Sequence, residues 1–245
     1  MLRALLLDLD GTLLDNPMDR FIPAYFQALT CYVADRVPPD ALIRELLRAT
    51  RAMELGDGSG PTNEETFAAH FYPALGLERA ELEPEFRRFY AEAFPSLKVF
   101  TRPRPEARLL VEAAFAQGLD VVIATNPVFP RAAIEERLAW AGVGVGSFAY
   151  TLVTCYEEMH ATKSDPAYYR EILARISRPP GDCLMVGDDW QWDMVAAAQC
   201  AIPGFWVSDA EAPLAALPVP LAGRGSLAEL LLRLEAGTLA TVPGA

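Results

Sequence analysis

Two aspartates near the start of the chain, Asp8 and Asp10, have the spacing that most directly indicates chemistry. They follow the apolar residues 5–7 and are followed by Gly11 and Thr12. Side chains two positions apart in an extended segment point to the same side, so both carboxylates can face one site. Two unpaired buried carboxylates cost several kcal/mol unless a cation or a proton offsets them. The pair therefore favours a bound divalent metal, although an Asp-x-Asp pair taken alone can simply end a strand.

Further residues that could bind a ligand lie at the ends of other predicted strands or just before a helix. They are Thr125, Asn126, Lys163, Asp188, Asp189 and Asp193. Ligands of parallel sheets bind beyond the carboxyl ends of the strands, so we expect the groups that follow a strand to lie at the same edge of the sheet as Asp8. Taken alone, a Thr-Asn pair is most often a turn, and an isolated lysine is usually a solvated surface charge.

The elements that must position these residues alternate along the chain. Apolar strands are predicted over 119–125, 148–154, 183–186 and 205–207, and helices over 105–117, 130–140, 166–176, 193–199 and 226–234. Alternating strands and helices with short connections imply a parallel sheet with right-handed crossovers. The first strand is apolar on both faces, which is typical of a central strand that helices cover on both sides. The sequence therefore predicts an α/β fold with a Rossmann-like parallel sheet.

A long segment after the first strand differs from the rest because its apolar residues recur at helical spacing. Thr62 and Glu65 have the spacing of a capping box that opens a helix, Gly76 ends that helix, and another helix is predicted over 85–94. The aromatic residues of this segment are interpreted as its core. The predicted domains are an α/β core at residues 1–15 and 99–245 and a smaller all-helical cap at residues 16–98.

Composition limits the classes of partner. The chain has 245 residues, enough for one core and a smaller module, and its net charge of −12 would repel a nucleic acid over most of the surface. Its four cysteines show no metal-binding spacing, and no apolar run is long enough to span a bilayer. We therefore expect a cytoplasmic protein that binds neither nucleic acid nor membrane. A small phosphorylated metabolite remains compatible, since a metal and a lysine can reverse the potential locally.

Residues 8–13, with the sequence DLDGTL, closely resemble motif I of the haloacid dehalogenase superfamily, most of whose members are magnesium-dependent phosphatases. Thr125-Asn126 resembles motif II, Lys163 resembles motif III, and Asp188 with Asp193 resembles motif IV. The four motifs occur in the family's order across nearly the whole predicted core. The helical insertion between motifs I and II resembles the cap of the phosphoglycolate phosphatase-like subfamily.

The resemblance implies a two-step mechanism. Asp8 would attack phosphorus to give an aspartyl phosphate, and Asp10 would protonate the leaving alcohol and later accept a proton from water. Thr125, Asn126 and Lys163 would hold the phosphoryl oxygens of a small phosphorylated substrate.

The resemblance also implies the metal ligands and their surroundings. Mg²⁺ would bind Asp8, the backbone carbonyl of Asp10 and Asp188. Asp189 stands where the family often has serine, and either Asp189 or Asp193 would complete the surroundings of the metal.

Two alternatives remain open at this point. A phosphomutase or another phosphotransferase of the same superfamily uses the same acids. A non-catalytic relative could instead bind phosphate or a protein partner. The superfamily's dehalogenases lack an acid at the position of Asp10, so Asp10 favours phosphoryl chemistry. The sequence indicates neither the identity of the substrate nor the oligomeric state.

Overall fold

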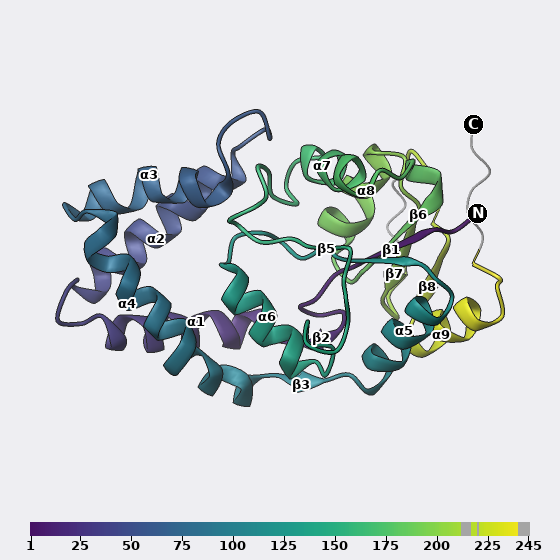
Figure 1. Cartoon of the computed structure of the whole chain (residues 1–245), viewed down its shortest axis with the longest axis horizontal. Helices are drawn as coiled ribbons and strands as arrows, with labels where there is room; N and C mark the ends of the chain where they lie inside the picture. The colour runs from purple at the N-terminus through teal and green to yellow at the C-terminus, as the bar shows by residue number, and fades with distance from the viewer. Residues whose placement is uncertain (212–216, 220, 240–245) are drawn as a thin grey trace.

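The computed structural model, which describes residues 1–211, 217–219 and 221–239, contains one main sheet of six strands in the order β5-β4-β1-β6-β7-β8 (Figure 1). Every neighbouring pair in this sheet is parallel, which confirms the predicted α/β class with a parallel sheet. The strands are β1 (Ala4–Leu7), β4 (Asp120–Ile123), β5 (Leu152–Val153), β6 (Cys183–Gly187), β7 (Gly204–Val207) and β8 (Gly223–Gly225).

Strand β1 lies at the centre of this sheet and is buried on both faces. Leu5 and Leu7 share one apolar cluster with α5 and α9, while Ala4 and Leu6 share the other with α7 and α8. Figure 1 shows these helix pairs on opposite sides of the strands. The helices are α5 (Pro105–Ala116), α7 (Ala167–Ile176), α8 (Ala196–Gln199) and α9 (Leu227–Glu235). An apolar strand with two covered faces is therefore the element around which the core is built.

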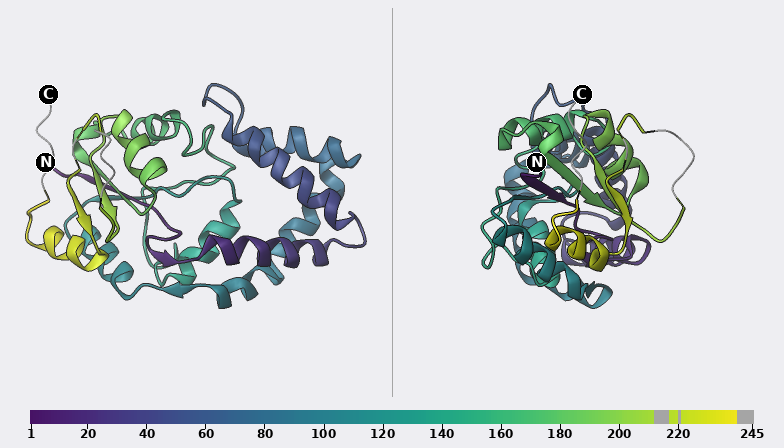
Figure 2. Two further views of the ribbon diagram at one scale, coloured as in Figure 1. Left: turned by 180° about the vertical axis from the view of Figure 1, so that it is seen from behind. Right: turned by 90° about the vertical axis from the view of Figure 1, so that its right-hand side faces the viewer.

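The helical insertion lies at the opposite end of the molecule from the sheet (Figures 1 and 2). The chain enters it after β2 (Leu14–Asp15) and leaves it before β3 (Arg102–Pro103), and these two short strands pair antiparallel. The insertion contains α1 (Met18–Tyr32), α2 (Pro39–Glu54), α3 (Asn63–Leu75), α4 (Arg79–Glu92) and the 3-10 helix η1 (Phe94–Phe100). The division into a core and a cap with limits at residues 16 and 98 stays a prediction.

Helix ends within the insertion follow local capping rules. Thr62 and Glu65 form the predicted capping box at the start of α3, and Gly76 ends that helix in the left-handed conformation. The prediction that the next helix starts at residue 85 is wrong. Helix α4 starts at Arg79 because Glu78 and Glu81 form a second capping box there.

Three other predicted elements differ in extent. The strand predicted over 148–154 is only the two residues of β5, because Phe148 stacks on Phe115 of α5 instead of pairing within the sheet. Strand β8 was not predicted, since its sequence Gly-Arg-Gly has no apolar pattern. The helix predicted from residue 193 begins earlier, with the π-helical turn η3 (Trp190–Val195).

An aromatic cluster joins the insertion to α6 (Arg131–Trp140). The Phe94 ring is fully buried and stacks on Trp140 with a centroid distance of 5.4 Å, and Phe21 meets it edge-on at 6.1 Å. Offset or edge-on aromatic contacts of this kind stabilise beyond their buried area. Among the residues that the structure describes, no helix has both the length and the apolar character needed to cross a membrane.

We expect Phe94→Ala to lower the free energy of unfolding by about 3–5 kcal/mol, because it leaves a cavity among packed rings. Phe100→Ala is the matched control, since the Phe100 side chain is 42% exposed; its effect should be about 1 kcal/mol or less. Urea denaturation followed by circular dichroism measures both. Equal effects of the two substitutions would contradict the role given to the aromatic cluster.

Candidate active site

The carboxyl ends of the three central strands bring residues from distant parts of the chain to one edge of the sheet. Asp8 directly follows β1, Asp188 directly follows β6, and Thr125 lies two residues beyond β4. The backbone N–H of Asp8 donates to the carbonyl of Val186 at 2.9 Å, so the two strands still pair where the acids emerge. Parallel strands that end together therefore set the positions of the candidate residues.

Lys163 occupies the centre of this group. Its Nζ donates to Asp8 Oδ1 and to Asp193 Oδ1, both at 2.6 Å, and the residue is only 3% exposed. Its backbone N–H donates to Asn126 Oδ1 at 3.1 Å, which fixes the Lys163 segment against the loop that follows β4. Lys163 is therefore a buried, doubly paired ammonium group and not a solvated surface charge.

The electrostatics show that negative charge exceeds positive charge at this edge. Burial alone would lower the pKa of Lys163, but Asp193 and Asp8 raise it well above its ordinary value. Burial raises the pKa of Asp8, and the ammonium of Lys163 opposes this effect. Burial and the charge of Asp8 raise the pKa of Asp188 to about 6. The single positive charge of Lys163 is thus too small to neutralise the carboxylates that surround it.

Three of these carboxylates have a geometry that fits a metal ion. Asp8, Asp188 and Asp193 can each offer one oxygen, and the three oxygens lie within 4.8 Å of one another. A set of carboxylate oxygens suits a hard divalent cation such as Mg²⁺. Asp193 is also engaged elsewhere, since its Oδ1 accepts from Lys163 and its Oδ2 accepts from the backbone N–H of Asp189 at 3.1 Å.

Asp10 has different partners from Asp8. The extended geometry from which we expected both side chains to face one site ends at Leu7, and Asp10 lies in the turn that follows. Its Oδ1 accepts from Asn16 Nδ2 at 2.7 Å, and its Oδ2 accepts from Nη1 of Arg137, which is 1% exposed. The guanidinium of Arg137 also lies 4.6 Å from the ring centroid of Phe129. The carboxylate of Asp10 therefore borders the acidic group without belonging to it.

Other side chains hold the loops around the site. The Thr12 hydroxyl donates to Asp188 Oδ1 at 3.2 Å. Asp189 Oδ1 accepts from the backbone N–H of Trp192 at 2.7 Å, so Asp189 caps the helical turn η3 and is not one of the three grouped acids. Thr125 is buried, and its carbonyl accepts from the Tyr168 hydroxyl at 2.9 Å.

Thr12, Asn16 and Arg137 contact the site although no sequence motif predicts a role for them. Arg137 could have been found, because it lies four residues after Ala133 and three after Ile134 on the buried face of α6. A charged residue on an apolar helix face needs a partner inside the protein.

Two glycines, Gly11 and Gly187, allow the carboxylates of Asp188 and Asp193 to lie close to the backbone. A Cβ on Gly11 would lie 2.3 Å from Asp188 Oδ2, and Gly11 also has a φ of +89°, which side chains disfavour. A Cβ on Gly187 would lie 2.1 Å from Asp193 Oδ2. The close packing of the acidic group thus depends on the absence of a side chain at both positions.

The chain is similar to known proteins over most of its length. A model of the haloacid dehalogenase-like hydrolase family matches residues 2–201. A phosphoserine phosphatase of Thermus thermophilus is 29% identical over 231 residues, which cover 84% of this chain and 88% of that protein.

Two solved structures share the fold over nearly their full lengths. A 2-haloacid dehalogenase from Pseudomonas syringae aligns over 97% of this chain and 99% of its own, with 21% identity and a TM-score of 0.63. A HAD phosphatase from Thermococcus onnurineus aligns over the same shares, with 17% identity and a TM-score of 0.56. At these identities the likeness shows the fold alone.

Gly187→Ala should lower the free energy of unfolding by about 1–3 kcal/mol, because its Cβ would displace the fully packed carboxylate of Asp193. Gly181→Ala is the matched control, since a Cβ there meets no atom within 4 Å. Urea denaturation of both variants checks this. A Gly187→Ala variant as stable as Gly181→Ala would show that Asp193 is not held as described.

The raised pKa of Asp188 predicts a pH dependence of stability in the metal-free protein. Its pKa moves from an ordinary value of 3.8 to about 6, so between these pH values the folded chain binds the proton more tightly than the unfolded chain. Stability should therefore fall as the pH rises through this range. Urea titrations with a chelator present should show a smaller fall in Asp188→Asn, and identical slopes would contradict the repulsion from Asp8.

Proposed function

The chain belongs to the haloacid dehalogenase-like hydrolase family, and we propose that it is a magnesium-dependent phosphatase that hydrolyses a small phosphorylated metabolite through an aspartyl phosphate. The observation that carries this proposal is the buried Lys163, whose ammonium joins the carboxylates of Asp8 and Asp193 at one edge of the sheet. A nucleophilic carboxylate, a fixed cation and further acids within reach are the parts that phosphoryl transfer requires.

Asp8, Asp188 and the backbone carbonyl of Asp10 would hold Mg²⁺, with Asp193 beside them. When bound, the ion would neutralise the acids and stabilise negative charge on the phosphoryl group. Support comes from the grouped oxygens of Asp8, Asp188 and Asp193 and from the raised pKa of Asp188. Because both oxygens of Asp193 accept hydrogen bonds, its main task would be to hold Lys163.

In the first step, a carboxylate oxygen of Asp8 would attack phosphorus while the bond from phosphorus to the alcohol oxygen breaks. Asp10 would give its proton to that oxygen, and the alcohol would leave. In the second step, water would attack the phosphorus of the aspartyl phosphate and pass a proton to Asp10, which releases Asp8 and inorganic phosphate. Lys163 and Thr125 would hold the phosphoryl oxygens, and Asn126 would position Lys163 through its backbone contact.

Arg137 and Asn16 would position Asp10 for these steps. Both oxygens of Asp10 accept hydrogen bonds from these two residues, which hold its carboxylate beside the site. An ion-paired carboxylate suits the second step, in which a base must take a proton from water. The first step requires Asp10 to carry a proton when the ester binds, so the contact with Arg137 would loosen at that stage.

The similarity to the Thermus phosphoserine phosphatase supports phosphate esters over halogenated acids as substrates. Asp10 supports the same choice, since the superfamily's dehalogenases lack this acid. A net charge of −12 argues against nucleic acid as a partner, and a cytoplasmic location is part of the proposal.

Asp8→Asn should lower kcat for phosphate release by more than about 1,000-fold, because the amide cannot act as the nucleophile. The asparagine keeps the shape of the side chain, so the variant should remain folded. Asp189→Asn is the matched control and should keep most of the activity, because asparagine also caps helices well. Phosphate release from para-nitrophenyl phosphate and a panel of metabolites, with and without Mg²⁺, measures this.

No phosphate release from any ester with any divalent metal would contradict the phosphatase and favour a binding protein. Equal activity of Asp8→Asn and the unmodified protein would remove Asp8 from the mechanism.

A further inference from the structure

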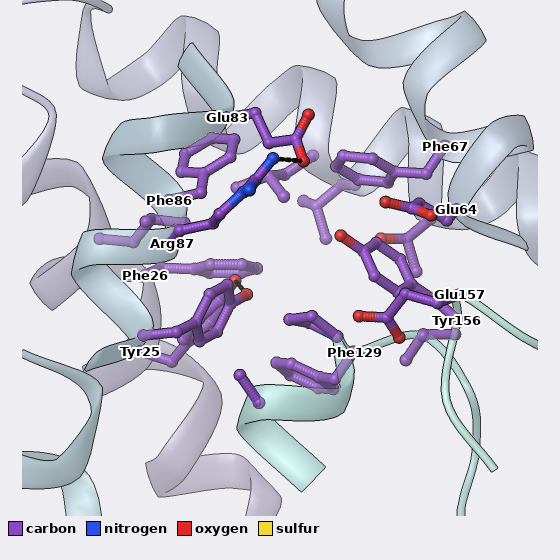
Figure 3. A pocket seen from close by; sticks show the side chains of 18 of the residues that line it. Tyr25, Phe26, Glu64, Phe67, Glu83, Phe86, Arg87, Phe129, Tyr156 and Glu157 are labelled. Carbon is purple, nitrogen blue, oxygen red and sulfur yellow. Dashed lines mark hydrogen bonds and ion pairs between the residues drawn. The ribbon is translucent and has the colours of Figure 1, made fainter. Parts of the chain in front are cut away.

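The helical insertion and the core enclose an aromatic pocket of about 380 Å³, which no step of the proposed mechanism uses. Figure 3 shows Tyr25, Phe26 and Phe86 on one wall, with Phe67 and Tyr156 facing them across the open space. Volumes of this size are typical of small-molecule sites. We call it the aromatic pocket below.

The wall of this pocket is largely uncharged. Burial raises the pKa of Tyr25 to about 12 and that of Tyr156 further, so both hydroxyls stay neutral. The Tyr25 hydroxyl is already paired with that of Tyr90 at 2.9 Å. An apolar group placed here would lose contact with water without breaking a polar interaction of the protein.

The charged residues that reach the pocket already have partners. Arg87 donates to Glu83 at 2.7 Å, as the dashed line in Figure 3 shows, and Arg79 pairs with both Glu83 and Glu64. Both oxygens of Glu157 accept from the backbone N–H of Arg131 at 2.9 Å. Since Arg87, the cation on the pocket wall, is paired, the pocket is poorly suited to a carboxylate.

The pocket lies next to the candidate active site. Its floor includes Val128, Phe129 and Pro130, which belong to the same loop after β4 as Thr125 and Asn126. The guanidinium of Arg137 lies over the Phe129 ring, and its Nη1 donates to Asp10 Oδ2. The pocket wall is therefore connected to Asp10 through the contact between Phe129 and Arg137.

We propose that the aromatic pocket binds the alcohol part of the substrate, and that this part is an uncharged, largely apolar group. The inference rests on the proposed function and narrows its substrate class to phosphate monoesters of apolar alcohols. Esters of hydroxy acids, whose leaving group carries a carboxylate, fit the paired charges of the pocket poorly. This chain would therefore differ in preference from a phosphatase that acts on phosphoserine.

A series of n-alkyl phosphates from methyl to octyl tests the proposal, because the leaving alcohols have similar acidity and differ mainly in apolar area. We expect kcat/KM to rise about fourfold with each added methylene until the pocket is filled. O-Phosphoserine and 2-phosphoglycolate should be poorer substrates than butyl phosphate. The same kcat/KM for every alkyl phosphate, or a higher kcat/KM for either hydroxy-acid ester than for butyl phosphate, would overturn the proposal.

Two leucines provide a matched pair of variants. Leu47 lines the pocket and is 54% exposed, whereas Leu109 on α5 is 52% exposed and lies outside it. Leu47→Arg should lower the ratio of kcat/KM for hexyl phosphate to that for methyl phosphate at least tenfold, and Leu109→Arg should leave this ratio unchanged. Thr50→Trp, which fills the pocket from α2, should lower it as well. Equal ratios in all variants would overturn the proposal.

Binding of 1-naphthol, measured by calorimetry, separates this inference from the proposed function because it needs no catalysis. We expect binding to the unmodified protein and to Leu109→Arg, and at least tenfold weaker binding to Leu47→Arg. The same affinity in all three proteins, or none in any, would overturn the pocket assignment even if esters are hydrolysed. Naphthol binding without hydrolysis of any ester would support the pocket and refute the phosphatase.

Discussion

The buried ion pairs of Lys163 with Asp8 and Asp193 join three distant segments of the chain at the candidate site. Transfer of an ammonium group from water into the protein interior is strongly unfavourable unless carboxylates compensate its charge. Here Asp8 and Asp193 each place a carboxylate oxygen 2.6 Å from the Lys163 Nζ. With Asp188 close by, the carboxylates outnumber the ammonium three to one. The folded protein thus holds an excess of negative charge that a divalent cation would relieve.

The fold supplies the rigid frame that this arrangement needs. Three parallel strands, each covered on both faces, end at one edge and place groups from across the chain within hydrogen-bonding distance. Gly11 and Gly187 leave room for the acids, and Thr12 holds Asp188. The aromatic cluster around Phe94 packs the insertion against α6, which carries Arg137 to Asp10. Helix α6 therefore takes part both in the packing of the insertion and in the positioning of Asp10.

The sequence predicted the parts of the site that follow an apolar strand or precede a helix, because strand order and polarity place them without knowledge of packing. Asp8 and Asp188 are of this kind, whereas Lys163 was predicted only from the resemblance to motif III. The partners of Asp10 could not be predicted in this way, since Arg137 reaches it only when α6 folds against the turn after β1. The aromatic pocket was hidden for a similar reason: its residues have the pattern of a packed core, and only their positions in space leave a cavity.

Calorimetric titration of the protein with Mg²⁺, in the absence and presence of inorganic phosphate, shows whether the acidic group of Asp8, Asp188 and Asp193 holds a metal ion. We expect one Mg²⁺ to bind to each chain, and to bind more tightly when phosphate is present, because the ion and Lys163 would both attract the phosphate oxygens. Loss of the Mg²⁺ signal in Asp188→Asn would assign that ion to the acidic group. Absence of Mg²⁺ binding at millimolar concentrations, with and without phosphate, would rule out a magnesium site at these carboxylates.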